Sequence, residues 1–334
     1  MPTAAEASNR AAKAECSLLD KLAKNGHHVA MGDRKSGVTR PPAHRFGGGW
    51  TESKLAIVQS YLRAYAIALK EKRFQIAYID AFAGTGYRSE KEEGPETGLL
   101  FPDLAADAPQ EFLEGSARLA LQVDPSFDKY LFIEKDPARC RVLETLKQEF
   151  PDRSARVQVR EGDANKVLQE ICGKPGWENL RAVLFLDPYG MQVEWDTIEA
   201  IANTGAIDLW LLFPLGMGLS RLLPRSGNIP DGWRRRLDLF LGTTDWQQAL
   251  YSERPRRSLF DDDAVEKVRA STGEVGRYFV DRLRTVFPAV SDSPRVLENS
   301  SRCPLYLLCF AVSSRNPQAQ RIALRIADHI LRSD

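Results

Sequence analysis

The sequence predicts an α/β fold built on an open parallel sheet. Short apolar runs are separated by helical patterns, which is typical of a parallel sheet with helices on both faces. The strands are expected at residues 75–80, 129–134, 155–164, 182–187 and 207–213. Four of these runs end on an acid or an acidic turn: Asp80, Glu134, Asp163 and Asp187. The carboxyl ends of parallel strands meet at one sheet edge, where such folds bind ligands, so we expect the four acids there.

The elements before the first strand are less regular. Residues 1–49 are rich in small and polar residues, so we expect a partly flexible arm with at most a short helix at 11–22. A helix is then expected to start at Thr51 as N-cap, because apolar residues recur after it at spacings of three and four. Residues 90–114 carry Gly, Pro and acids and predict a long loop.

The later elements complete the predicted architecture. Helices are expected at residues 115–123 and 137–150, and a further strand at 304–312. A closing helix has Asn316 as N-cap and Pro317 at its first position. The predicted organisation is an N-terminal arm (1–49), a core (50–217), an arginine-rich helical insertion (218–293) and the final strands and helix of the core (294–334).

Composition excludes several classes of protein. The 334 residues are 43% hydrophobic with a net charge of +1, so the chain has an ample core, and a nucleic-acid partner would need a local basic patch. The five cysteines are scattered without a C-x-x-C pair, which favours reduced thiols and a cytoplasmic location. The histidines and cysteines lack zinc spacing, so no metal is expected. No apolar run has membrane-spanning length, and the N-terminus has no signal core.

The turn after the first strand predicts the kind of ligand. Gly84 and Gly86 follow Asp80 and let the backbone turn tightly and a ligand approach it. The third glycine of the dinucleotide fingerprint and the Gly-Lys-Ser/Thr of a Walker loop are absent. Glu134 can accept both hydroxyls of a ribose, and Asp163 can reach an adenine amine. Because these turns lack phosphate-binding basic residues, they favour S-adenosylmethionine over NAD or ATP.

Four segments carry a resemblance to a known family. "AYIDAFAGTGYR", "LFIEKD", "REGDAN" and "LFLDPYG", in this order and spacing, resemble the three-Cys-motif partner proteins of the class I S-adenosylmethionine-dependent methyltransferase superfamily. The resemblance runs from "WTESK" to "LLFPLG". It implies a Rossmann-like class I methyltransferase sheet, S-adenosylmethionine as cofactor and a three-cysteine-motif protein as partner.

The resemblance also implies site residues. The methionine moiety of the cofactor would be lined by Asp80, Phe82, Gly84 and Gly86, the ribose held by Glu134, and the adenine met by Asp163 and Ala164. The catalytic motif would be Asp187-Pro188-Tyr189 followed by Gly190. In methyltransferases that act on base amines, the acid and the proline carbonyl accept hydrogen bonds from the amine, and the aromatic ring stacks on the base. "DPYG" has one proline and is similar to the D-P-(F/Y)-G of tRNA guanine dimethyltransferases.

A basic cluster lies in the predicted insertion. Eight arginines and four acids lie between residues 221 and 257, an excess of four positive charges. The guanidinium group suits phosphate, and Trp233 and Trp246 are candidate stacking platforms. The predicted substrate-binding residues are Arg221, Arg225, Trp233, Arg234, Arg235 and Arg236. The alternative is a solvated helix face with ion pairs.

These observations predict methyl transfer from S-adenosylmethionine to a base nitrogen in RNA or DNA. Two alternatives stay open. One is a non-catalytic or cofactor-binding protein that docks a three-cysteine protein, and the other is a small-molecule methyltransferase with an apolar lid in place of the insertion. Each acid also has a purely structural alternative: a helix cap for Asp80, a surface acid for Glu134, and turn residues for Asp163 and Asp187. Tyr189 could equally pack in the core.

Overall fold

The computed structural model describes residues 49–83, 115–188, 190–216, 222–224, 227–255, 265–299 and 301–333. All of them belong to one compact unit, residues 47–334. The predicted arm and its helix at 11–22 and the predicted loop at 90–114 lie outside the described residues. So do five predicted site residues: Gly84, Gly86, Tyr189, Arg221 and Arg225.

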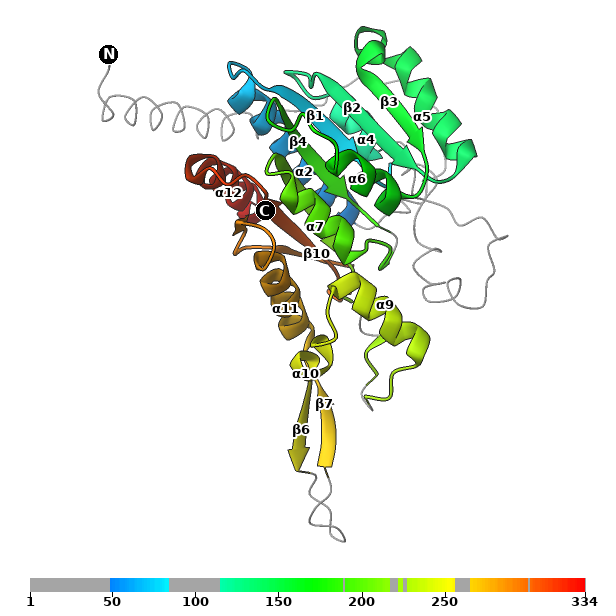
Figure 1. Ribbon diagram of the computed structural model, residues 1–334, viewed down its shortest axis with the longest axis vertical. Helices are drawn as coiled ribbons and strands as arrows, with labels where there is room; N and C mark the ends of the chain where they lie inside the picture. Colours follow the sequence, from blue (N-terminus) through cyan, green and yellow to red (C-terminus); the bar gives the residue numbers. More distant parts are fainter. Residues whose placement is uncertain are drawn as a thin grey trace, which may run out of the picture. The chain divides into compact units, whose positions relative to one another are not determined.

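A mixed sheet of eight strands forms the centre of this unit (Figure 1). Its strands are β1 (Gln75–Asp80), β2 (Lys129–Glu134), β3 (Val157–Glu161), β4 (Leu180–Leu186), β5 (Ile207–Phe213), β8 (Ala289–Val290), β9 (Arg295–Glu298) and β10 (Pro304–Val312). The order is β3-β2-β1-β4-β5-β10-β8, with β9 also paired to β10. β1 to β5 are parallel, and β10 runs antiparallel to β5. This is the Rossmann-like sheet of the class I methyltransferase fold, as the sequence predicted.

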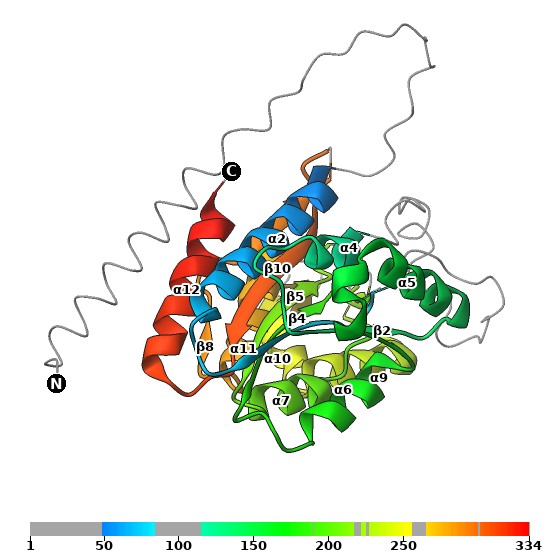
Figure 2. The same cartoon turned by 90° about the horizontal axis from the view of Figure 1, so that it is seen from above.

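Helices cover both faces of the sheet (Figure 2). One face carries α2 (Gly49–Leu69), α4 (Gly115–Leu121), α5 (Pro137–Glu149) and α12 (Pro317–Arg332), and the other carries α6 (Ala164–Cys172), α7 (Trp195–Asn203) and α11 (Thr272–Arg284). A short 3-10 helix, η2 (Pro151–Arg156), links α5 to β3. Asn316 caps α12 as predicted. The predicted start of the first helix at Thr51 is wrong: α2 already includes Gly49, so Thr51 lies within its first turn and cannot be the N-cap.

The two faces of the sheet have cores of different composition. Beneath α2, the rings of Tyr61, Trp210 and Phe310 lie with centroids 4.8–5.3 Å apart. The opposite face buries aliphatic side chains together with stacked Phe213 and Phe279 rings, whose centroids are 3.9 Å apart. Both cores contact β5, which is buried along its whole length. β5 therefore anchors the segment that follows it.

That segment contains more than helices. After β5 come α9 (Asp231–Leu241), α10 (Trp246–Leu250) and a hairpin of β6 (Tyr251–Pro255) and β7 (Val265–Arg269), which projects away from the central sheet in Figure 1. The hairpin is not among the elements predicted from the sequence. The division of the chain at residues 218 and 293 stays a prediction, and it places β8, a strand of the central sheet, inside the insertion.

Candidate functional site

The acids predicted from the strand ends lie along one edge of the sheet. Asp80 is the last residue of β1 and Glu134 the last of β2. Asp163 follows β3, and Asp187 directly follows β4. In the register of the sheet, Asp80 is level with Phe185, two residues before Asp187. Because β3, β2, β1 and β4 are parallel neighbours, the four acids meet at their carboxyl ends, on either side of the point where the strand order reverses.

Asp80 is completely buried. The Tyr78 hydroxyl donates to its Oδ2 over 3.2 Å and the Phe82 amide donates to its Oδ1 over 3.3 Å. Burial raises the pKa of Asp80 to about 6, and the negative charge of Asp187 adds to the rise, while hydrogen bonds from Ser116, Phe82 and Tyr78 oppose it. Asp80 is therefore held by three hydrogen-bond donors at the end of β1 and is electrostatically coupled to Asp187.

Glu134 offers an unsatisfied acceptor. Glu134 is 5% exposed, and its Oε1 accepts a hydrogen bond of 2.8 Å from the Asp136 amide. Its Oε2 is buried and has no hydrogen-bond partner among the described residues. A buried carboxylate oxygen without a donor is costly, and native structures rarely retain one unless a ligand or water donates to it. Glu134 is therefore not a surface acid, and Oε2 fits a group that brings hydroxyl donors.

Asp163 has a structural role as a helix cap, and this role is compatible with binding a ligand. It is the N-cap of α6, and its Oδ1 accepts from the Lys166 amide over 3.1 Å. Ala164, the first helical residue, is buried. The cap holds the start of α6 at the same edge as Glu134, whose carbonyl accepts from the Gly162 amide over 2.9 Å. The predicted adenine contacts of Asp163 and Ala164 stay a prediction.

Sequence reasoning missed the partner of Asp187. Lys54, on α2, is 2% exposed and donates its Nζ to Oδ2 of Asp187. The same Nζ lies 5.9 Å from the centroid of the Phe185 ring. A signal was present, because Lys54 precedes the buried residues Val58 and Tyr61 by four and seven positions, which places it on the apolar face of its helix. A lysine on such a face needs a buried counter-charge.

Asn165 of "REGDAN" has a positioning role that the sequence did not predict. It is buried, and its Nδ2 donates to the Gln192 carbonyl over 2.8 Å. Its Oδ1 accepts from the Glu194 amide and from the Thr197 hydroxyl, each over 2.9 Å. Pro188 is buried, and Gly190 has a positive φ of 71°. Asn165 thus ties the chain just after "DPYG" to the helix that Asp163 caps.

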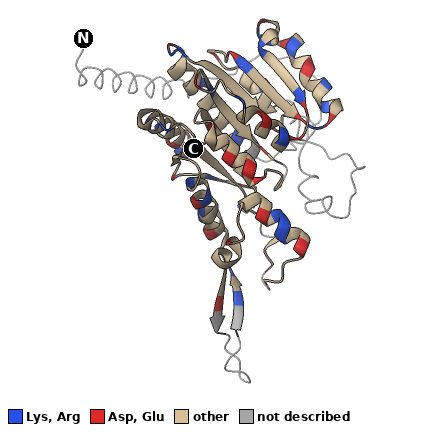
Figure 3. Cartoon of the chain, in the orientation of Figure 1, with Lys and Arg blue, Asp and Glu red and all other residues tan. Residues whose placement is uncertain are grey.

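The predicted basic cluster is only partly available to a ligand. Figure 3 shows basic and acidic positions together on α9. Arg234 and Arg235 are exposed, whereas Arg236 is half-buried and Trp233 packs against the hydrophobic core. The interpretation of Trp246 as a stacking platform is wrong: its side chain is fully buried and its Nε1 donates to Asp238 over 2.7 Å. Of the four residues that the structure describes among the predicted contacts, Arg234 and Arg235 are the ones presented to solvent.

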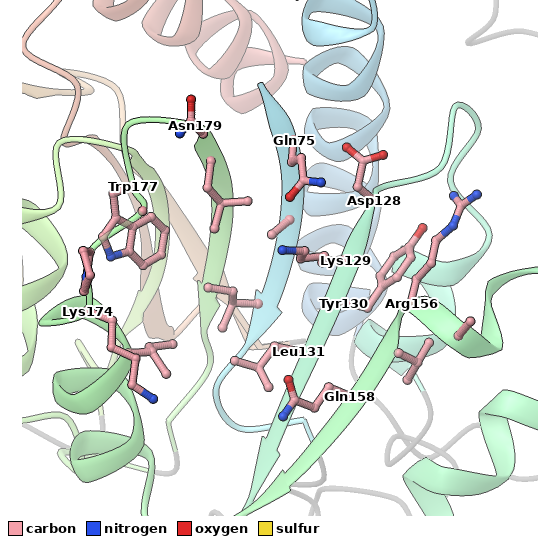
Figure 4. Close-up of a pocket in the computed structure, with 18 residues that line it drawn as sticks. Gln75, Asp128, Lys129, Tyr130, Leu131, Arg156, Gln158, Lys174, Trp177 and Asn179 are labelled. Carbon is pink, nitrogen blue, oxygen red and sulfur yellow. The ribbon is translucent and has the colours of Figure 1, made fainter. Parts of the chain in front are cut away.

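A separate pocket lies towards the amino-terminal ends of the parallel strands (Figure 4). Its volume is about 580 Å³, and it is lined by residues of β1, β2, β3 and β4 and by the segment that joins α6 to β4, with Gln75, Lys129 and Trp177 among its residues. None of the four strand-end acids lines it. It is therefore distinct from the edge where Asp80 and Glu134 lie.

No model of a known protein family matches the chain, and a search among curated proteins found no match. Solved structures similar to the chain include protein LPL1258 from Legionella pneumophila, with 14% identity, a TM-score of 0.40, and coverage of 84% of this chain and 92% of that one. They also include the putative methyltransferase yhhF from Escherichia coli (14% identity, TM-score 0.27, coverage 64% and 86%). A third is an S-adenosylmethionine-dependent methyltransferase from Clostridium acetobutylicum (8% identity, TM-score 0.31, coverage 77% and 92%). With TM-scores below 0.5, these likenesses carry no weight for the activity.

Among the described residues, no helix is long and apolar enough to cross a membrane. The same residues contain no group of three His, Cys, Asp or Glu side chains placed to hold a metal ion.

Proposed function

We propose that the chain is an S-adenosylmethionine-dependent methyltransferase that methylates a base nitrogen in nucleic acid. The observation that carries the proposal is the buried, unpartnered Oε2 of Glu134 at the end of β2, beside Asp80 and Asp187. A nucleoside with free ribose hydroxyls would satisfy this oxygen. Glu134 ends β2, the neighbour of β1, and the strand order reverses between β1 and β4. When bound, S-adenosylmethionine supplies a methyl group activated by a sulfonium centre.

The proposed binding roles are those that the resemblance implies. Glu134 accepts hydrogen bonds from the ribose hydroxyls. Asp80 and Phe82, with Gly84 and Gly86 in the turn after them, surround the methionine moiety. Asp163 and Ala164 meet the adenine at the start of α6. These donors and acceptors match a nucleoside that bears no phosphate.

The transfer roles belong to "DPYG". Lys54 holds Oδ2 of Asp187, and the other carboxylate oxygen accepts a hydrogen bond from the acceptor amine. That bond turns the nitrogen lone pair towards the methyl group, and Asp187 takes up the proton that the nitrogen releases on methylation. The carbonyl of Pro188 orients the same amine, and Tyr189 stacks on the base.

The nucleic-acid assignment is supported by the arginines and by the resemblance of "DPYG" to base-methylating motifs. Arg234 and Arg235 are exposed and form no ion pair with another described residue, which argues against a purely ion-paired surface. With Arg221 and Arg225 they would contact phosphates. On the resemblance stated above, we also propose that the chain belongs to the three-Cys-motif partner proteins and binds a three-cysteine protein.

Calorimetry with S-adenosylmethionine and S-adenosylhomocysteine tests the cofactor. We expect a Kd in the micromolar range, about 8 kcal/mol of binding free energy. Transfer of a tritiated methyl group to total tRNA, rRNA, genomic DNA or cell extract then tests the acceptor. Folded protein that binds neither nucleoside would refute the methyltransferase assignment. Binding followed by labelling of protein or of small molecules alone would refute the nucleic-acid substrate.

A further inference from the structure

The ion pair of Lys54 and Asp187 is built into the fold. Lys54 comes from α2 on one face of the sheet, and Asp187 follows β4 at its carboxyl edge. The Lys54 side chain is 3% exposed and that of Asp187 is 25% exposed. Burying an ammonium group is costly unless its charge is paired, so α2 is expected to present Lys54 here in every folded molecule. Asp187 is therefore an acid with a permanent counter-charge.

The pair changes the charge that a ligand meets. Asp80, Glu134 and Asp187 lie at the same edge, and the charge of Asp187 acts on Asp80. Lys54 cancels the charge of Asp187 locally but leaves the carboxylate able to accept a hydrogen bond. The local charge at the carboxyl ends of the strands is then negative near Asp80 and Glu134 and close to zero near Asp187. A cation is therefore attracted to the region near Asp80 and Glu134 but gains no electrostatic stabilisation near Asp187.

We propose that Lys54 sets the acceptor specificity by neutralising Asp187, so that the site takes an uncharged amine nitrogen and excludes alkylammonium groups. The inference rests on the proposed function, because it concerns the acceptor of that same site. An exocyclic base amine is uncharged and can donate to Asp187. A polyamine or a lysine side chain would bring its ammonium next to that of Lys54, and this repulsion discriminates against it. Lys54 is a positioning residue here, since it acts through Asp187.

The first measurement is binding of propylammonium chloride to protein saturated with S-adenosylhomocysteine, by calorimetry against matched sodium chloride. Wild type is expected to show no binding. Lys54→Met leaves Asp187 without its counter-charge and should bind propylammonium at least about tenfold more tightly. The double variant Lys54→Met/Asp187→Asn, an uncharged pair of similar size, should return to the wild-type result. Wild type that binds propylammonium as tightly as Lys54→Met would overturn the inference.

The second measurement separates this inference from the proposed function. The affinity ratio of S-adenosylmethionine to S-adenosylhomocysteine should rise roughly three- to tenfold in Lys54→Met, because a positive charge near the sulfonium is removed. Lys54→Arg should keep the wild-type ratio. A ratio that does not depend on residue 54 overturns the inference alone, and wild type that binds neither nucleoside overturns the proposed function. Circular dichroism checks folding, and Lys54→Gln replaces Lys54→Met if the latter is unfolded.

Discussion

At the scale of single residues, the site depends on side chains whose polar atoms are not all satisfied within the protein. Glu134 keeps one carboxylate oxygen buried and unpartnered among the described residues, while its other oxygen is held by the Asp136 amide. Asp80 is completely buried, and its burial raises its pKa to about 6 although Ser116, Phe82 and Tyr78 donate hydrogen bonds to its carboxylate. Such groups lower the stability of the empty fold and gain interactions when a ligand arrives. The destabilising residues are therefore the ones expected to bind.

Replacing Glu134 tests this at one atom. Glu134→Ala should weaken S-adenosylmethionine binding by roughly 1.5–3 kcal/mol, because the ribose hydroxyls are left without their acceptor. Its free energy of unfolding should stay level or rise, since a buried, unpartnered oxygen is removed. Calorimetry and urea titration measure the two effects. Glu161→Ala, an exposed acid at the end of the neighbouring strand, is the matched control and should change neither. Equal affinities for wild type and Glu134→Ala would contradict the ribose role.

At the scale of elements, α9 is held to the core by close packing at its C-terminus. Gly242 ends α9 in the left-handed conformation, with φ of 64°. A Cβ at this position would lie 2.1 Å from the Trp195 ring. The Arg282 guanidinium lies 4.5 Å from the centroid of the same ring, and its Nε donates to the Leu241 carbonyl over 3.1 Å. This packing joins the start of α7, the end of α9 and α11, so the arginines of α9 have a defined support.

Two glycines of this region should respond oppositely to alanine. Gly242→Ala combines a positive φ with a severe clash and should lower the free energy of unfolding by at least about 2 kcal/mol. Gly232→Ala, within the same helix, meets no atom within 4 Å and should be neutral or stabilising by up to about 1 kcal/mol. Urea titration of the two variants measures both effects. Similar stability for both would mean that α9 does not dock on Trp195 as described.

The exposed arginines of α9 predict a salt effect on nucleic-acid binding. Arg234 and Arg235 point about 100° apart around the helix, so a single nucleic-acid strand is expected to contact one or both of them. For single-stranded targets, removing both should reduce the slope of log affinity against log salt by about 0.7 for each phosphate that they neutralise. Filter binding of tRNA and single-stranded DNA at several salt concentrations measures the slopes. Asp231→Ala, which removes an exposed negative charge from the first turn of the same helix, is the comparison of opposite charge. Identical slopes for wild type and Arg234→Ala/Arg235→Ala would assign these arginines to a solvated surface.

At the scale of the whole molecule, buried acids link stability to pH. Asp208 at the start of β5 is buried and accepts a 2.6 Å hydrogen bond from the Tyr61 hydroxyl. Burial raises its pKa to about 7, against the opposing effects of Tyr61 and Arg181. Asp80 behaves similarly, with a pKa of about 6. Both acids bind a proton more tightly in the folded than in the unfolded chain, so the stability they contribute is complete below the unfolded pKa near 3.8 and is lost as pH rises through 6 to 7.

Stability measured across this range tests the linkage. Each acid should lower the free energy of unfolding by about 1.4 kcal/mol per pH unit between its unfolded and folded pKa values. Asp208→Asn keeps an acceptor for Tyr61 but does not titrate, so the difference from wild type isolates this one group. We expect the variant to gain on wild type as pH is raised from about 4.5 to about 8 in urea titrations. A constant difference across that range would show that Asp208 stays ionised in the folded protein.

Much of the fold could be predicted because its signals are local in the sequence. β1, β2, β5 and β10 have the predicted bounds, since each is a short apolar run between turn residues. The hairpin of β6 and β7 was missed because its strands carry mixed polar residues without an apolar alternation, and they pair with each other rather than with the sheet. The sequence could not show that Arg234 and Arg235 are exposed while Arg236 is half-buried, because the burial of each α9 side chain depends on which elements pack against the helix.

The sequence by itself determined where the acids stand relative to the strands. An apolar run followed by a carboxylate is a local property, and parallel pairing then brings Asp80, Glu134 and Asp187 to one edge. The tertiary structure alone decided how each acid is satisfied. Lys54 is 133 residues from Asp187 in the chain, and the Tyr61 partner of Asp208 is 147 residues away. No local pattern encodes such pairs, because they exist only once α2 packs across the sheet.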